Sequence, residues 1–294
     1  MIRRAGAPRT PFAVSRTRLL LDITTPRHAR RYADAHRCQC GELWLPRGRG
    51  PHPVIVTIHG GSWAARHTKV VMRGLAGDLA RRGFAVWNIE YRRVGRGQGG
   101  GWPATFADVA AAVDHLGALD APLDLQHVTL LGHSAGGSLA LWAAGRAGLP
   151  DGAPGAEPAI RPVAVVAQAA PTDLATIYRE YGGGAVGWLM GGSPERFPER
   201  YAVADPIARV PLSVPVLLVH GTDDRVVSVR RSRNYAAAAA AAGGEVELVE
   251  IAGAGGDHRR HVDPDGAAWT VVTDWLEGPV RDRVSADGAR AQRA

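Results

Sequence analysis

The sequence predicts an α/β fold, in which a mostly parallel central sheet is covered by helices on both faces. Short continuous apolar runs such as residues 54–58 (VIVTI) are typical of strands that are buried on both sides. Segments with the apolar spacing of helices alternate with these runs along the chain. Strands that alternate with helices form βαβ units with right-handed crossovers, so neighbouring strands are expected to run parallel.

The strands are expected at six apolar segments, the last of which alternates more than the others: residues 54–58, 84–89, 128–131, 163–166, 216–219 and 245–251. Helices are expected between and after them, at residues 70–82, 103–116, 135–146, 229–242 and 265–276. Pro103 suits the first position of its helix, and Gly83 follows the end of another. Residues 19–23 and 39–45 are expected to add antiparallel strands at one edge of the sheet.

The chain length and the breaks in this alternation indicate the domain organisation. A chain of 294 residues suits one large α/β domain, which we predict over residues 12–278. Residues 148–162 form a loop rich in Gly and Pro, and residues 172–206 form an insertion that we predict to be a small cap over the site. The polar tail, residues 279–294, is predicted to be disordered.

The composition argues against several classes of protein. Hydrophobic residues make up 46% and charged residues 21% of the chain, which is ordinary for a globular protein. No apolar run reaches the roughly 18 to 20 residues that span a bilayer, so no membrane association is expected. The net charge is +7, but Lys69 is the only lysine and the arginines are scattered, so we expect no nucleic-acid partner. The Arg-rich N-terminus lacks the apolar region of a secretory signal. The expected location is therefore cytoplasmic, and the expected assembly is a monomer or homodimer.

The cysteines and histidines do not form the pattern of a metal site. Cys38 and Cys40 lie two residues apart in a segment expected to be a strand, so both side chains would point to one face. A zinc site needs two more ligands at matching spacing, and a structural disulfide needs a distant partner. The chain also lacks an H-E-x-x-H motif. We therefore expect half-buried strand cysteines, no metal and no cofactor.

The strongest functional motif is GHSAG at residues 132–136, a G-x-S-x-G sequence. It directly follows the strand expected at residues 128–131 and opens a helix, which is the context of a nucleophile elbow. Glycines at both ends allow the sharp turn, and the helix N-terminus favours developing negative charge near the Ser134 hydroxyl. The motif predicts Ser134 as a nucleophile. The alternative is a glycine-rich turn that only caps a helix.

A second motif, HGGSW at residues 59–63, ends the strand expected at residues 54–58. Two successive glycines allow the backbone to approach a substrate carbonyl closely. A main-chain N–H near Gly60 or Gly61 would then act with the N–H of Ala135 as an oxyanion hole. The alternative is an ordinary turn that uses glycine for its positive φ.

A serine nucleophile requires a histidine base and an orienting carboxylate, and both are expected after the serine in the chain. The strand at residues 216–219 is followed by Asp223 and Asp224, at the end of the sheet where α/β proteins build their sites. We select Asp224, although either aspartate could instead cap the next helix. A glycine-rich loop then leads to His258, which we select as the base over His261.

Five segments in the expected order resemble α/β-hydrolases of the esterase, lipase and kynurenine-formamidase-like group: HGGSW at 59–63, WNIEYRRVG at 87–95 with GGGWP at 99–103, GHSAGG at 132–137, HGTDDRVV at 220–227 and DHRRHVDP at 257–264. The resemblance covers roughly residues 42–277 and implies the α/β-hydrolase fold with a small cap insertion. In that group the aspartate four residues after the strand-end histidine is the triad acid, and the histidine before a V-D-P segment is the base. The resemblance thus also selects Asp224 and His258. Glu90 resembles the group's buried strand-end glutamate, which we expect to pair with Arg92 or Arg93.

The predicted reaction is hydrolysis of a small carboxylic ester or activated amide, such as a formamide, through an acyl-enzyme. The protein would then be a serine carboxylesterase or an arylformamidase, with a small molecule as its partner. Aromatic side chains are expected to line the substrate pocket, although they could equally be core: Trp63, Trp102, Tyr178, Tyr181 and Trp188. Relatives often have a histidine in place of Ser138, which leaves the substrate open. Alternatives are a peptidase, an acyltransferase or thioester-releasing enzyme on the same triad, or a non-catalytic ligand-binding protein.

Overall fold

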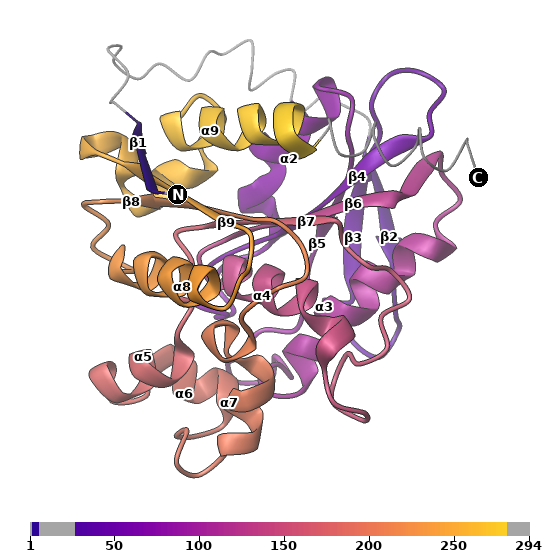
Figure 1. The fold of residues 1–294 in the computed structure, drawn as a ribbon. Coiled ribbons are helices and arrows are strands. Elements are labelled where there is room, and N and C mark those ends of the chain that lie inside the picture. The colour runs from indigo at the N-terminus through magenta and orange to yellow at the C-terminus, as the bar shows by residue number, and fades with distance from the viewer. Residues whose placement is uncertain (1, 6–26, 281–294) are drawn as a thin grey trace.

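The computed structural model describes residues 2–5 and 27–280, and within these residues nine strands form one sheet (Figure 1). Their order across the sheet is β1-β9-β8-β7-β6-β4-β5-β3-β2. In chain order the strands are β1 (Ile2–Ala5), β2 (Arg27–Arg31), β3 (Cys40–Trp44), β4 (His52–Ile58), β5 (Ala85–Ile89), β6 (Leu123–His133), β7 (Ala164–Gln168), β8 (Val216–Gly221) and β9 (Val246–Ile251).

Most neighbouring strands run parallel, as predicted. Every neighbouring pair from β1 across to β5 is parallel, whereas β3 is antiparallel to both β5 and β2. The antiparallel strand expected at residues 39–45 is therefore confirmed as β3. The other expected edge strand, at residues 19–23, lies outside the described residues. The strand beside β3 is β2, whose sequence RHARR is exposed throughout, so no apolar pattern identified it. Its charges are typical of edge strands that avoid further pairing.

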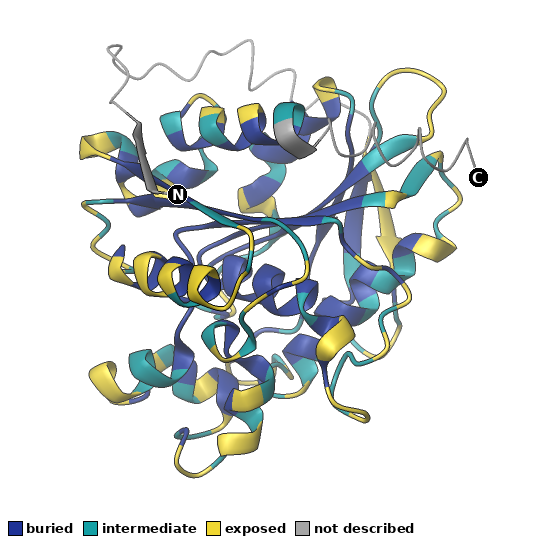
Figure 2. Cartoon of the chain, viewed as in Figure 1, coloured by how far each residue is buried: buried dark blue, intermediate teal, exposed yellow. Residues whose placement is uncertain are grey.

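Helices cover both faces of the sheet (Figure 1). One face is covered by α2 (Arg73–Arg81) and α9 (Ala267–Trp275). The other face is covered by α3 (Ala104–Asp114), α4 (Ala135–Ala144) and α8 (Arg230–Ala241). Successive strand residues point to opposite faces, so two apolar cores result. In β4, Ile55 belongs to the core of α2 and α9, whereas Val54 and Val56 belong to the core of the other face. Figure 2 shows the sheet buried between exposed outer helix surfaces.

Several predicted elements differ from the structure at their ends. The helix expected from residue 70 begins as a 3₁₀ turn, η1 (Lys69–Met72), where the Thr68 side chain accepts a hydrogen bond from the amide of Val70. The last helix ends in a π turn, η7 (Leu276–Val280). The tail predicted to be disordered, residues 279–294, lies outside the described residues except for its first two positions, which complete η7. Cys38 is buried in the turn before β3 and not within a strand, because β3 begins only at Cys40.

The insertion at residues 172–206 forms three short helices, which are labelled α5, α6 and α7 in Figure 1. They are α5 (Leu174–Tyr181), α6 (Gly184–Met190) and α7 (Pro198–Ala204). Val186, Leu189 and Tyr201 of the insertion are buried in the same core as α3, α4 and α8. The amide of Trp102 also donates a hydrogen bond to the carbonyl of Leu189, at 2.6 Å. The insertion is thus packed onto one face of the domain.

Candidate active site

Ser134 lies in the sharp turn between β6, which ends at His133, and α4, which begins at Ala135. Its backbone angles, φ 53° and ψ −124°, are rare for a residue with a side chain. A Cβ atom at Gly132 would lie 2.1 Å from the carbonyl oxygen of Gly136, so this turn requires glycine. The Ser134 amide donates a hydrogen bond to the carbonyl of Gln168, at 2.7 Å, which helps to hold the turn. The local geometry is the one that the G-x-S-x-G motif predicts.

Ser134, His258 and Asp224 form one hydrogen-bonded line. His258 Nε2 lies 2.9 Å from Ser134 Oγ, and His258 Nδ1 lies 2.7 Å from Asp224 Oδ2. The three residues follow β6, β9 and β8, so the carboxyl ends of the strands bring them together. With its Nδ1–H donated to the carboxylate, the imidazole can accept the serine proton at Nε2. The other histidine considered for the base, His261, is buried, with its ring centre 6.2 Å from that of His133.

The carboxylate of Asp224 is stabilised in its ionised form. Burial alone would raise the pKa of this carboxyl, but hydrogen bonds from His220 and His258 and from the main chain hold the pKa well below its ordinary value. Its Oδ1 atom accepts hydrogen bonds from the amides of Val226 and Val227, at 2.8 and 3.0 Å. The group is therefore a fixed negative charge beside the His258 ring at neutral pH.

His133, in the variable position of the elbow, supports the main chain of His258. Its Nε2 atom lies 2.9 Å from the carbonyl oxygen of His258, to which it donates a hydrogen bond. Burial, together with the neighbouring His258, lowers the pKa of His133 to about 3, so the ring is neutral under ordinary conditions. The sequence carried no signal for the contact, because the two residues are 125 positions apart.

The loop at residues 59–63 lies against the elbow. A Cβ atom at Gly60 would lie 2.9 Å from Ser134 Cβ and 2.7 Å from the His133 carbonyl oxygen, so glycine is needed for this approach. Ser62 and Trp63 adopt positive φ values of 55° and 54°. Within the described part of the chain, the amides of Gly60, Gly61, Ser62 and Ala135 are among those of this region that donate no hydrogen bond. Of these residues, Ser62 and Ala135 line the cavity beside Ser134, and sequence reasoning did not single out Ser62.

A buried pair fixes the start of this loop. His59 Nε2 lies 2.8 Å from Glu90 Oε1, and the Tyr91 hydroxyl donates to the His59 carbonyl at 2.8 Å. Burial would raise the pKa of Glu90, but His59 and Arg93 lower it overall. Arg93 lies 3.7 Å from Glu90, as one of the two expected partners. Arg92, the other of the two alternatives, binds Asp108 through two nitrogens, so Arg93 is the arginine that pairs with Glu90.

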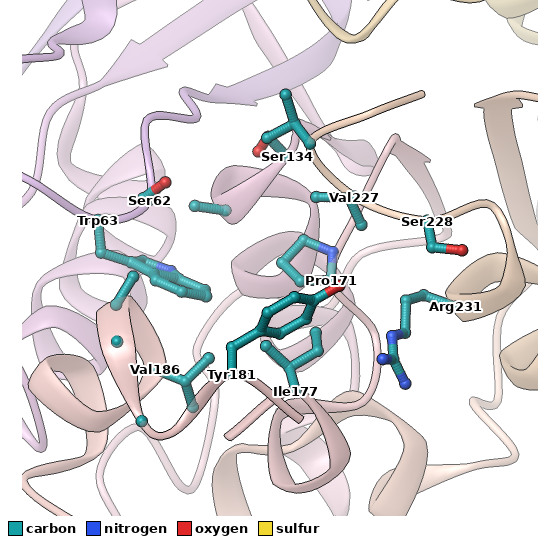
Figure 3. Close-up of a pocket in the computed structure, with 15 residues that line it drawn as sticks. Ser62, Trp63, Ser134, Pro171, Ile177, Tyr181, Val186, Val227, Ser228 and Arg231 are labelled. Atoms are coloured by element: carbon teal, nitrogen blue, oxygen red, sulfur yellow. The ribbon is translucent and has the colours of Figure 1, made fainter. Parts of the chain in front are cut away.

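A cavity of about 210 Å³ opens beside Ser134 (Figure 3). Its lining joins the elbow and the loop at residues 59–63 to the cap and to the segment after β8: Ser62, Trp63, Ser134, Ala135, Pro171, Ile177, Tyr181, Gly183, Gly184, Ala185, Val186, Val226, Val227, Ser228 and Arg231. Two of the five predicted pocket aromatics, Trp63 and Tyr181, are among these residues. Sequence reasoning missed the aliphatic residues and Arg231.

The other three predicted pocket aromatics lie elsewhere. Trp102 packs edge-on against Phe106, with ring centres 5.3 Å apart, and Tyr178 packs against Tyr201 at 6.5 Å. Trp188 is 70% exposed on the outside of α6. The short cap helices have aromatic residues on more than one side, so residue type alone did not show which side faces the cavity.

Among the described residues, no group of three or more His, Cys, Asp or Glu side chains is arranged to hold a metal ion. No described helix combines the length and apolar character needed to cross a membrane.

Comparison with known proteins gives a family match over most of the domain. Residues 42–238 match the family described as BD-FAE. Esterase LipC of Mycobacterium tuberculosis (strain ATCC 25618 / H37Rv) is 27% identical over 232 residues, a match that covers 70% of this chain and 53% of LipC. This chain thus spans about half the length of the curated relative that it matches.

Solved esterase structures share the fold. A truncated form of a carbohydrate esterase from gut microbiota has a TM-score of 0.74 and 23% identity, and the match covers 87% of this chain and 98% of that chain. The butyrate-bound esterase Est2 of the Planctomycetes species Thermogutta terrifontis has a TM-score of 0.68 and 21% identity, with coverages of 86% and 94%. These similarities confirm the α/β-hydrolase fold.

Proposed function

Because this chain belongs to the BD-FAE family and has the α/β-hydrolase fold, we propose that it is a serine esterase whose catalytic triad is Ser134, His258 and Asp224. The observation that carries the proposal is the hydrogen-bonded line of these three side chains beside a cavity. A protein that only bound a ligand would not need a hydroxyl, a base and a carboxylate in this order. The name of the matched relative, an esterase, supports the same class.

The proposed reaction proceeds in two acyl-transfer steps. The Ser134 Oγ attacks the ester carbonyl carbon while its proton passes to His258 Nε2, and the carbonyl electron pair moves onto oxygen. The ionised Asp224 stabilises the imidazolium through Nδ1–H. The tetrahedral intermediate then expels the alcohol, which takes the proton from His258, and leaves an acyl-enzyme. Water repeats the sequence: it gives a proton to His258 and attacks the acyl carbon, and Ser134 regains the proton as the acid leaves.

The oxyanion would be stabilised by main-chain amides. The amide of Ala135 lies at the N-terminus of α4, where the helix dipole also favours negative charge. The loop at residues 59–63 supplies the second donor, from Gly60 or Gly61 as the motif predicts, or from Ser62, which lines the cavity. Loss of one such donor typically costs about 10² to 10³ in kcat.

The cavity suits a short or aromatic group. A cavity of about 150 Å³ is enough for benzene, so one of about 210 Å³ admits a small acyl chain or a single ring. Trp63, Ile177 and Val186 give the lining an apolar character. The butyrate bound to the structurally similar Est2 is consistent with a short acyl group. We therefore propose carboxylic esters as substrates, and an activated amide or formamide as the second class.

Hydrolysis of three substrates by the wild type and by Ser134→Ala tests this function: p-nitrophenyl acetate, p-nitrophenyl butyrate and N-formylkynurenine. We expect the wild type to hydrolyse the esters, and the variant to lose activity toward them. Hydrolysis of N-formylkynurenine alone would favour the formamidase. A fluorophosphonate probe should label Ser134 in the folded wild type. Absence of hydrolysis would favour a binding protein or a specialised acyl transfer, and absence of labelling as well would favour the binding protein.

A further inference from the structure

Arg231 is a buried cation in the lining of the cavity beside Ser134. It lies in α8 and is 2% exposed, yet it lines the same cavity as the proposed nucleophile. Its Nη1 atom is buried and donates no hydrogen bond to any described residue. In Figure 3 the guanidinium lies at the end of the lining that is remote from Ser134. A buried donor without an acceptor is costly in a folded protein, so this nitrogen requires an explanation.

The charges around Arg231 restrict what it can bind. Its Nη2 atom pairs with Glu180 of α5, and its Nη1 atom lies 3.9 Å from Asp173 Oδ2. Glu180 is also paired with Arg230, at 2.6 Å. Two arginines thus face two carboxylates, and the formal charges cancel. A substrate carboxylate placed here would meet Glu180 and Asp173 without an unpaired cation to compensate. A neutral oxygen can accept the Nη1 hydrogen bond without adding charge.

We propose that Arg231 selects substrates whose group in the cavity carries a neutral oxygen acceptor, such as a ketone or ester carbonyl, several atoms from the scissile bond. This inference rests on the proposed esterase function and names a determinant of its specificity. A site with a buried donor disfavours an analogue that lacks the acceptor, because the donor is then left without a partner. A hydrogen bond to a charged group corresponds to a preference of about 10- to 100-fold.

Arg230 provides a matched control for the role of Arg231. The two residues are adjacent in α8 and both bind Glu180, so either change weakens the contact between α8 and the cap. Only Arg231 lines the cavity, whereas the Arg230 side chain is 61% exposed. A purely structural contribution to cap packing should therefore appear in both variants. A loss of substrate selection should appear only in the variant of Arg231.

Three p-nitrophenyl esters of matched shape test the inference: 4-methylpentanoate, 4-oxopentanoate and the monoester of succinate. They present a branched alkyl group, a ketone and a carboxylate at the same position of the acyl chain. A second series of two esters places the alkyl group or the ketone on the alcohol side, in the acetates of 4-methylpentan-1-ol and 4-oxopentan-1-ol. Each kcat/KM is divided by the rate constant for hydrolysis of the same ester by hydroxide without enzyme. This removes differences in intrinsic reactivity between the esters. The wild type, Arg231→Met and Arg230→Met are compared.

In at least one series we expect the wild type to prefer the ketone over the alkyl ester by about 10- to 100-fold, and to hydrolyse the succinate ester poorly. Arg231→Met should bring the ketone-to-alkyl ratio close to one, and Arg230→Met should keep it. If Arg231→Met does not fold, the wild-type ratio still tests the inference. Hydrolysis with equal ratios in both series would overturn the role of Arg231 and leave the esterase function intact. A preference for succinate would overturn the neutral-acceptor assignment. No hydrolysis of any ester would overturn the proposed function, and this inference with it.

Discussion

The Nε2–H group of His133 is directed at the carbonyl oxygen of His258, and the nitrogen and the oxygen are 2.9 Å apart. The residue before the proposed nucleophile therefore holds the main chain of the proposed base. The side chain of the same base contacts Ser134 and Asp224. His258 is thus fixed at its backbone by the elbow and at its ring by the acid loop.

Replacement of His133 by phenylalanine should reduce both stability and activity. The buried carbonyl of His258 would lose its donor, so the free energy of unfolding should fall by about 1 to 3 kcal/mol. If poorer positioning of His258 raises the activation free energy by about 1.4 kcal/mol, kcat falls about tenfold. Urea unfolding and ester hydrolysis measure the two effects, with the exposed His28→Phe as the control. An unchanged kcat in folded His133→Phe would show that the base is held without this contact.

The lowered pKa of His133 predicts a loss of stability in acid. Burial favours the neutral ring in the folded protein, where the pKa is about 3, whereas an unfolded histidine has a pKa of about 6.5. Between these values the unfolded chain binds the extra proton. The resulting contribution to stability is therefore complete above about pH 6.5 and is lost progressively as the pH falls toward 3. Unfolding free energies should be measured from pH 8 to 4. Their slope should be smaller in His133→Phe, by up to about 1.4 kcal/mol per pH unit, and equal slopes would refute this assignment.

Substitution of Asp224 by asparagine should keep the hydrogen-bonding geometry but remove the charge. A neutral amide can stabilise the wrong tautomer of His258, so kcat for ester hydrolysis should fall by about 10³- to 10⁴-fold. The pKa of this carboxyl is lowered in the folded protein, so its charge stabilises the fold above the pKa of an unfolded aspartate, about 3.9, and that stabilisation is lost at lower pH. The stability difference between wild type and Asp224→Asn should accordingly be largest near neutral pH. A decrease in kcat of less than tenfold would argue against Asp224 as the triad acid, and Asp223→Asn is the matched control.

The sequence was most informative where chemistry depends on local geometry. The apolar runs identified the parallel strands, and the spacing of Gly132 and Gly136 predicted the turn that presents Ser134. Parallel strands place their carboxyl ends at one edge of a sheet, so residues as far apart as Ser134 and His258 could be expected to meet there. Their catalytic roles stay a prediction.

Contacts between distant side chains and short polar strands were not predictable in the same way. Nothing in the neighbourhood of His59 or Glu90 indicates that they would pair across two strands. The strands β1 and β2 have the sequences IRRA and RHARR, which lack an apolar pattern and depend on pairing with the rest of the sheet. On the cap, helical periodicity was too short to show that Tyr181, although 69% exposed, lines the cavity while Trp188 does not.

The approach of Gly60 to the elbow can be tested by adding a single methyl group. In Gly60→Ala the new Cβ would lie 2.9 Å from Ser134 Cβ and 2.7 Å from the His133 carbonyl oxygen, which is backbone and has little freedom to move. The loop at residues 59–63 must shift away, and with it the proposed oxyanion donors, so we expect kcat to fall by about 10² or more while the fold is retained. Gly117→Ala is the matched control, because its Cβ would meet no atom within 4 Å and should leave kcat unchanged. If Gly60→Ala retains full activity, the second oxyanion donor does not come from this loop, and Ala135 must act with a donor from another segment.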